Sequence, residues 1–362
     1  MKAMADKNLH VMLMYVISHL GLIFFMYPGN VISSTEQGHW LPVLIGVSIH
    51  FLFITIYMKG LSYFPKKDII RIYAGIGKWT TIFFIIPIFF YFSMILLITV
   101  RAYAEIITIV FLSNTPLWAI MLLLISISTY IAIKGVETIF RTGLLLSLLF
   151  LPVIIFIFFT SFQNADWRYI VPLDADLGFL MKRTYFESFF AFSGGFLFLG
   201  FVQPYFSYDR KYILWAGAFL IPFFLFSVYI PVLTFGQATS ATTFLPYVIA
   251  VDAININWLM FDRVTMFFLL SLICFIMLYI SLVSWKAVRI ANHYLPAIKP
   301  VKLLLSLSTL VFISCFFIPD WRAVEQLFWW NTFLRFYILV AVPLSLLFFG
   351  YRMKRKSKHE NM

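Results

Sequence analysis

Charged side chains are scarce in this sequence. Only 12% of its 362 residues are Asp, Glu, Lys or Arg, while 62% are hydrophobic. A water-soluble domain of this size needs many more charges to cover its surface. Apolar runs of about 18 or more residues recur along the chain, and each is long enough to cross the bilayer as a helix. The runs lack the alternation typical of barrel strands, so the sequence predicts an all-α polytopic membrane protein.

Cysteine and the common catalytic motifs are also nearly absent. Cys274 and Cys315 both lie in apolar runs, where they are typical of small buried side chains, and no disulfide framework is expected. There is no phosphate-binding loop, dinucleotide glycine pattern, His/Cys metal spacing or nucleophile–base set. We therefore expect no enzyme activity, no cofactor and no metal. The net charge of +12 lies largely in short loops, which favours contacts with membrane lipids and no nucleic acid.

About ten segments are expected to cross the membrane as helices. They are residues 9–28, 40–58, 80–110, 116–134, 143–161, 185–204, 212–235, 264–286, 302–318 and 333–351. The first follows Lys2 and Lys7 and lacks a small-residue cleavage pattern, so we expect it to remain as a span. The chain then forms a single transmembrane domain over residues 1–362, with residues 352–362 as a basic cytoplasmic tail.

Basic residues are unequally shared between the two sides of this arrangement. Twenty of the 27 Lys and Arg residues lie before the first span, in even-numbered loops or in the tail, and six lie in odd-numbered loops. Lys286 is counted among those of the eighth loop. Because Lys and Arg in short loops are retained on the cytoplasmic side, we expect both termini to be cytoplasmic.

Two glycine-containing spans lie five spans apart. Gly21 is in the first span, which we expect to end at Pro28, and residues 193–195 are in the sixth. Glycine inside a helix can unwind it, but small residues are also common where membrane helices pack closely. Spans five apart run in opposite directions. The pairing therefore predicts an inverted repeat of residues 1–161 and 185–351, with helices 1 and 6 broken at the membrane centre.

Two broken helices would enclose a cavity at the midplane. Their inner N-termini favour an anionic group and their inner C-termini offer carbonyls to a cation, so a small zwitterion such as an amino acid is expected. The residues predicted to bind it are His19, Gly21, Leu22, Phe92, Tyr103, Ser193, Gly194, Gly195 and Phe196. Leu270–Cys274 is a weaker candidate wall. For His19, a satisfied buried histidine remains an alternative interpretation.

Few ionisable residues lie inside the predicted spans. Arg101 and Glu105 are four residues apart on one helical face and can pair. The pair either stabilises the outer end of the third helix or acts as a gate above the cavity. Glu187 lies near the outer start of the sixth span, and Leu245–Ala250 is expected to form a short external helix. The other spans have no acidic residue at the midplane, which argues against proton coupling.

Several short patterns occur in a characteristic order along the chain. They are Gly21 through Pro28; Phe64-Pro65, Ile72-Tyr73 and Gly77-Lys78; Arg101 through Glu105 with Thr115-Pro116; and Tyr130 through Arg141 with Gly135 and Glu137. Together they resemble the spore germinant receptor B-subunit family, a branch of the amino acid–polyamine–organocation transporter superfamily. The chain departs from relatives at His19 or Leu20, where they often have glycine, and at Phe196, where many have glutamate.

The resemblance implies a leucine-transporter-like fold and a place in the inner membrane of a bacterial endospore. It also implies assembly with an A subunit, a membrane protein with soluble domains, and a lipoprotein C subunit. We expect a receptor subunit that binds a small germinant and signals by a change of conformation. An amino acid permease for the same ligand is the main alternative, because fold alone does not separate the two. A scaffold for partner subunits is a third interpretation.

Overall fold

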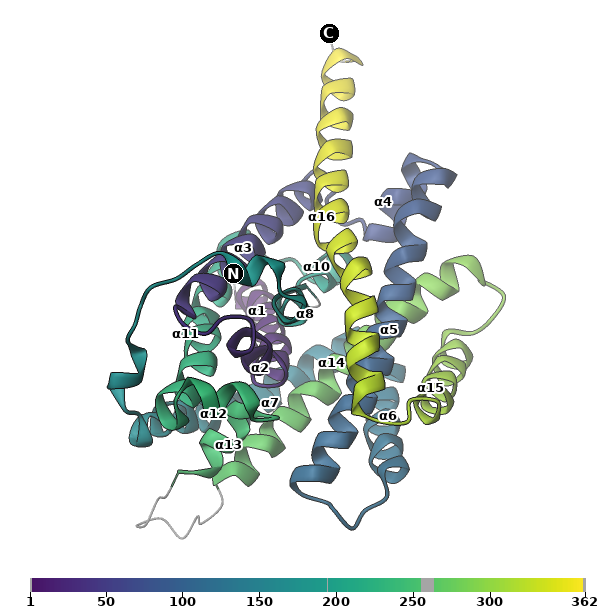
Figure 1. Cartoon of the computed structure of the whole chain (residues 1–362). Coiled ribbons are helices and arrows are strands. Elements are labelled where there is room, and N and C mark those ends of the chain that lie inside the picture. The colour runs from purple at the N-terminus through teal and green to yellow at the C-terminus, as the bar shows by residue number, and fades with distance from the viewer. Residues whose placement is uncertain (1, 194, 255–263, 361–362) are drawn as a thin grey trace.

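The computed structural model describes residues 2–193, 195–254 and 264–360, and these residues form helices and connecting loops without strands (Figure 1). The helices of the first half are α1 (Lys2–Ile23), α2 (Tyr27–Ile32), α3 (Trp40–Ser62), α4 (Ile69–Ile76), α5 (Lys78–Val110), α6 (Leu117–Ile133) and α7 (Val136–Thr160). Three short 3₁₀ helices follow, η1 (Ser161–Asn164), η2 (Trp167–Ile170) and η3 (Gly178–Met181). The second half contains α8 (Arg183–Ser188), α9 (Phe190–Ser193), α10 (Phe198–Val202), α11 (Arg210–Phe235), α12 (Gln237–Thr242), α13 (Pro246–Asp252), α14 (Val264–Tyr294), α15 (Pro300–Phe316) and α16 (Trp321–Glu360).

Six helices of the described chain are long and apolar enough to cross a membrane. They are α3, α5, α7, α11, α14 and α16. Three more of the expected spans are shorter apolar helices, Asn8–Ile23 within α1, Leu117–Ile133 and Pro300–Phe316. The expected span 185–204 is divided among α8, α9 and α10. The chain is therefore a polytopic α-helical membrane protein.

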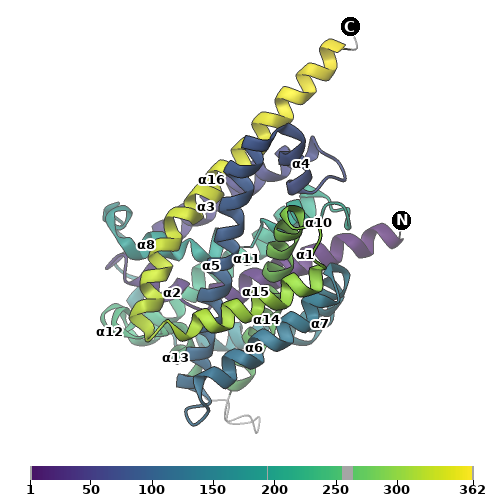
Figure 2. The same cartoon turned by 90° about the vertical axis from the view of Figure 1, so that its right-hand side faces the viewer.

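Helix α14 lies at the centre of the bundle. It packs against α1, α5, α6, α7 and α15, and 67% of its most apolar stretch is buried inside the protein. Helix α1 packs on α7, α11 and α14, while α16 lies along α3 and α5. The two cartoon views agree that the last turns of α16 extend beyond the other helices (Figures 1 and 2). The interrupted segments are thus packed against long helices, α1 against α14 and α11, and α8 and α9 against α16.

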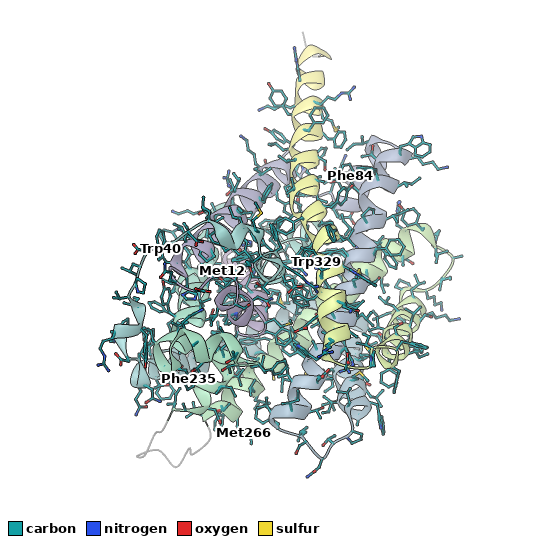
Figure 3. All side chains as sticks on the ribbon, viewed as in Figure 1. Met12, Trp40, Phe84, Phe235, Met266 and Trp329 are labelled. Atoms are coloured by element: carbon teal, nitrogen blue, oxygen red, sulfur yellow. The ribbon has the colours of Figure 1, made fainter. Side chains whose placement is uncertain are left out.

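The last helix is much longer than the sequence predicts. It begins at Trp321 rather than near residue 333 and continues to Glu360, so the start of the expected tail is helical. Phe84 of α5 lies beside α16 in Figure 3, and its ring stacks on Tyr73 of α4 at 4.8 Å. The long α16 therefore provides a surface on which α3, α4 and α5 are aligned.

Helix α14 also continues beyond its predicted end. We expected it to stop at residue 286, but it reaches Tyr294 because Ala287, Val288 and Ile290 extend its buried face. Lys286 is consequently a fully buried residue of this helix. Its assignment to a cytoplasmic loop was wrong, although the surrounding basic residues keep the charge asymmetry between the two sides.

A tight turn joins α6 to α7. Only Lys134 and Gly135 separate the two helices. Gly135 has φ 91°, a backbone conformation that side chains with a Cβ rarely adopt. The turn makes α6 and α7 antiparallel neighbours, and both then pack against α14.

Candidate ligand site

The first helix is interrupted three residues after Gly21. Helix α1 ends at Ile23 and α2 begins at Tyr27. A Cβ built on Gly21 would meet Phe275 of α14 at 3.5 Å, so this glycine lies at a helix–helix contact. Pro28 does not end the span as expected, because it occupies the first turn of α2, where a missing N–H costs nothing.

Tyr103 of α5 contacts the end of α1. Its hydroxyl donates a hydrogen bond to the Gly21 carbonyl, which lies among the last carbonyls of α1, where intrahelical donors run out. The Tyr103 ring also stacks on Phe25 in the interruption, with 4.3 Å between centroids. Leu22 beside it is buried. A residue of an uninterrupted helix therefore stabilises the first interruption.

The second interruption lies next to His19 of α1. Helix α9 ends at Ser193 and α10 begins at Phe198, while Gly194 lies outside the described residues. A Cβ on Gly195 would lie 2.2 Å from Cε1 of the His19 imidazole, far inside van der Waals contact. Only glycine leaves room for His19 here, so the two interrupted segments meet at this pair.

Two aromatic side chains of α3 hold the segment that follows Gly195. The Phe196 ring packs edge-on against His50 and Tyr57, with centroids 5.8 and 5.4 Å apart. The Tyr57 hydroxyl donates to the Leu197 carbonyl at 3.0 Å. Phe196 is fully buried, so it gives the junction an apolar side chain at this position.

His19 presents an unpartnered acceptor at the junction. Its Nδ1 donates to the Tyr15 carbonyl at 2.8 Å, which leaves the lone pair on Nε2 when the ring is neutral. That buried Nε2 has no hydrogen-bond partner among the described residues. The Tyr15 hydroxyl is itself hydrogen-bonded to His50 Nε2 at 2.5 Å. His19 is therefore available to accept a hydrogen bond from an ammonium or hydroxyl group.

A cavity of about 530 Å³ is called the outer cavity, because its lining residues Arg183 and Arg322 belong to loops that are expected to be external. It is lined from four directions, by residues following the first interruption, by α8, by the α12 region and by the start of α16. The lining residues are Met26, Gly29, Asn30, Ser33, Arg183, Thr184, Glu187, Ala241, Thr243, Phe244, Trp321, Arg322, Glu325 and Gln326. The cavity thus touches both interrupted segments and contains charges of both signs.

Arg183 and Glu187 form the charged floor of this cavity. The Arg183 Nε donates to Glu187 Oε1 at 2.8 Å, and its Nη2 donates to the Glu325 carbonyl at 3.1 Å. The fully buried Arg335 of α16 donates from Nη1 to the Glu187 carbonyl at 3.0 Å. Helix α16 therefore positions α8, the outer piece of the second interrupted segment.

The ligand-binding residues predicted from sequence lie outside this cavity: none of those that the structure describes lines it. Tyr103 instead borders a narrow apolar void with Leu272 and Ile273, two of the weaker candidates. Phe92 lies under the Lys286 ammonium group, 4.3 Å from Nζ to the ring centroid. The structure thus groups His19, Gly195 and Phe196 together, and places Phe92 elsewhere.

Arg101 and Glu105 form an ion pair on α5. Arg101 also donates from Nε to the Ile318 carbonyl at 3.1 Å and from Nη2 to the Pro319 carbonyl at 3.3 Å. These carbonyls belong to the turn between α15 and α16. The pair therefore connects α5 to that turn and does not border the outer cavity.

Most of the polar residues that line the outer cavity were not predicted from the sequence. Asn30 and Glu325 carry no motif. Arg183 and Glu187 do have the four-residue spacing of a helical ion pair, which could have revealed them. Lys286 and Arg335 lie at the ends of the predicted spans 264–286 and 333–351 and were counted with the loop residues, whereas both side chains are buried inside helices. Within the described chain, no group of three or more His, Cys, Asp or Glu side chains is arranged to hold a metal ion.

These features define a polytopic helical membrane protein with two interrupted helical segments and a polar outer cavity between them. A family model described as spore germination protein matches residues 7–322. The chain belongs to this family, which confirms the resemblance found in its motifs, and the family is not a known class of enzyme. No curated protein matches the chain.

Proposed function

We propose that the protein is the nutrient-sensing subunit of a spore germination receptor. It binds a small germinant, an amino acid, between the two interrupted segments and signals to partner subunits. The observation that supports this is the outer cavity, which touches Asn30 after the first interruption and Glu187 of the second segment. Its volume of about 530 Å³ falls in the range of small-molecule sites.

The lining chemistry fits a zwitterion. Arg183 and Arg322 offer cations to a carboxylate, and Glu187 and Glu325 offer anions to an ammonium group. Asn30 adds a buried Nδ2 that has no partner among the described residues. Because the two segments are interrupted, their short helices can tilt relative to the long helices, which stay in place. A ligand that binds one tilt more tightly than another shifts the population of conformations, and this shift is the signal.

The architecture that goes with this function has ten spans. In it, α1 with α2 counts as one span and α8 through α10 as another, and residues 1–161 and 185–351 form two inverted sets of five. The basic residues favour cytoplasmic N- and C-termini. The protein then lies in the inner membrane of the endospore, with its termini on the core side, and assembles with A and C subunits.

Germination of spores on a panel of nutrients tests the proposal. Deletion of the gene should remove the response to one nutrient class. Asn30→Leu should raise the half-maximal concentration of that nutrient by at least tenfold, because it removes a polar contact inside the cavity. The matched control is Glu36→Gln, an exposed change outside the cavity, which should leave the response unchanged. If deletion alters no response, the receptor function is wrong.

An amino acid permease using the same cavity is the second candidate. Lys286 supports it, since an ionisable group buried inside a membrane helix is the kind of residue that proton-coupled transport uses. Uptake of labelled amino acid into proteoliposomes separates the two functions. Accumulation indicates a permease, and binding without uptake indicates a sensor.

A further inference from the structure

A second cavity lies at the opposite end of α15 from the outer cavity. Its volume is about 440 Å³, and α4, α6, α14 and α15 contribute to its lining. Helices α6, α14 and α15 pack against one another and are seen together in Figure 2. The cavity includes the first residues of α15, whereas the outer cavity includes the first residues of α16. It is therefore separate from the proposed ligand site.

One end of this cavity is polar and basic. Arg71, Arg289, Asn292 and His293 line it. The Arg289 guanidinium contacts the rings of Tyr205 and Trp285, 5.3 and 5.4 Å from their centroids. It is also paired with Asp68, the one acidic residue of the described lining.

Asp68 does not cancel the remaining positive charge. Its side chain is 2% exposed, is held by Arg289, and accepts a hydrogen bond from the Arg71 backbone N–H at 2.8 Å as the N-cap of α4. Lys134, Lys299 and Lys302 are exposed and are next in sequence to the lining residues Ile133, Pro300 and Val301. The entrance therefore attracts an anion.

The rest of the cavity wall is apolar. Ala132, Val288 and Leu304 form a small buried cluster, with Ile133 packed against it. From there α6 and α15 expose large apolar side chains to their surroundings along their length, among them Leu123, Ile127, Leu305 and Leu310. An apolar wall that continues into the exposed apolar surface of α6 and α15 fits an acyl chain. Its described residues have no polar side chain that could bind a free inorganic anion.

We propose that this cavity binds an anionic phospholipid of the membrane leaflet on the basic side of the protein. The phosphate lies at Arg71 and His293, and the start of an acyl chain lies along Ile133 and Leu304. Basic pockets between membrane helices on the cytoplasmic side commonly take such headgroups. The bound lipid would add a link between α4 and the packed helices α6, α14 and α15, beside the Arg289–Asp68 pair that connects the start of α4 to α14.

Thermal unfolding of the purified full-length chain in detergent, titrated with phosphatidylglycerol, phosphatidylcholine or inorganic phosphate, tests the proposal. Phosphatidylglycerol should raise the melting temperature by several degrees more than phosphatidylcholine. Arg71→Gln should weaken its apparent affinity about fivefold, as expected for one surface cation near an anionic lipid. Val301→Trp, which leaves the charges intact and fills the cavity from an exposed lining position, should weaken it at least as much.

The matched control is Arg352→Gln, which removes an exposed cation of α16 that does not line the cavity. It should leave the phosphatidylglycerol affinity unchanged. Equal stabilisation by phosphatidylcholine would overturn the proposal, as would equal losses in the Arg71 and Arg352 variants. Full stabilisation by inorganic phosphate alone would also overturn it in favour of a simple anion site. Native mass spectrometry of the Arg71→Gln protein counts retained lipid without depending on unfolding.

Discussion

At the scale of single residues, the two interrupted segments depend on one close contact. The imidazole of His19 occupies the volume that a side chain at position 195 would need, and its Nδ1 is fixed by the Tyr15 carbonyl. A buried polar atom with no partner is costly unless something binds it. The unpartnered Nε2 of His19 is therefore the most informative atom of the junction.

Gly195→Ala should destabilise the protein by about 1–3 kcal/mol, the usual cost of overpacking a tight site. His19→Ala in the same chain should relieve much of that loss, because it removes the atoms that the new methyl group would meet. Thermal unfolding of the two single variants and the double variant measures the coupling. Gly75→Ala is the control, since a Cβ there meets nothing within 4 Å. Additive losses at residues 19 and 195 would contradict the contact.

Burial of the Lys286 side chain also costs folding free energy. Its ammonium group is fully buried, and among the described residues it has an aromatic face but no hydrogen-bond partner. A cation–π contact returns about 2 kcal/mol, less than the several kcal/mol needed to bury the charge. Lys286→Met should therefore raise the free energy of unfolding by about 1–2 kcal/mol, as measured by thermal unfolding. A less stable Met variant would show that the charge is compensated.

At the scale of helices, uninterrupted elements hold the interrupted ones. Helix α5 holds the end of α1 through Tyr103 and the Gly21 carbonyl. Helix α16 holds the end of α8 through Arg335 and the Glu187 carbonyl. In both cases a long side chain satisfies backbone groups that a broken helix leaves unpaired. The long helices therefore act as the frame against which the interrupted segments can move.

Arg101→Gln should loosen the turn between α15 and α16. The change removes hydrogen bonds to the Ile318 and Pro319 carbonyls and leaves Glu105 without its partner, at a cost of about 2–3 kcal/mol. Labelling of the buried Cys315 with a maleimide, in a Cys274→Ser background, should become faster. Glu105→Gln should have a smaller effect, since Arg101 keeps both carbonyls. Equal labelling rates in all three proteins would contradict this role.

Acid should weaken the start of α3. Burial lowers the pKa of His39, just before α3, to about 4, while an unfolded histidine titrates near about 6.5. The folded state therefore binds fewer protons, and stability falls as the pH drops from about 6.5 towards 4, by about 2 kcal/mol at pH ~4.5. Unfolding at neutral and acidic pH should show a smaller drop for His39→Gln than for the unchanged protein. An identical drop would assign the acid sensitivity to other groups.

At the scale of the whole molecule, the distribution of charge predicts the orientation in the membrane. The basic residues around the lipid cavity and on the last turns of α16 all lie on the side expected to be cytoplasmic. The lining of the outer cavity contains charges of both signs instead, and of these Arg183 and Glu187 are paired. The same asymmetry thus separates a face suited to anionic lipid from a face suited to a zwitterionic nutrient.

Cysteine labelling in cells lacking Cys274 and Cys315 tests this orientation. Ser113→Cys, in the loop between α5 and α6, should react with a membrane-impermeant maleimide from outside intact cells. Arg352→Cys, on α16, should react only after the cells are permeabilised, because the positive-inside rule places it in the cytoplasm. Reaction of both residues from the same side would show that the ten-span topology is wrong.

Much of the fold was predictable because hydrophobic length is a local property. The segments that became α3, α5 and α11 are long apolar runs, and their expected bounds lie within four residues of the helices observed, whereas α7 begins seven residues before its expected start. Helix ends were less predictable. Lys286 and Arg335 would be costly inside a lipid-exposed helix, so hydropathy places them in loops. Inside the bundle an aromatic ring and backbone carbonyls accommodate them.

By itself, the sequence determined that this chain is a polytopic helical membrane protein of the spore germination family. Those conclusions rest on run length, composition and short motifs, which need no knowledge of neighbours. Only the tertiary structure decided where the first helix ends, which atom faces Gly195 and where the cavities lie. Each of these depends on side chains from helices far apart in sequence, whose contacts no local pattern encodes.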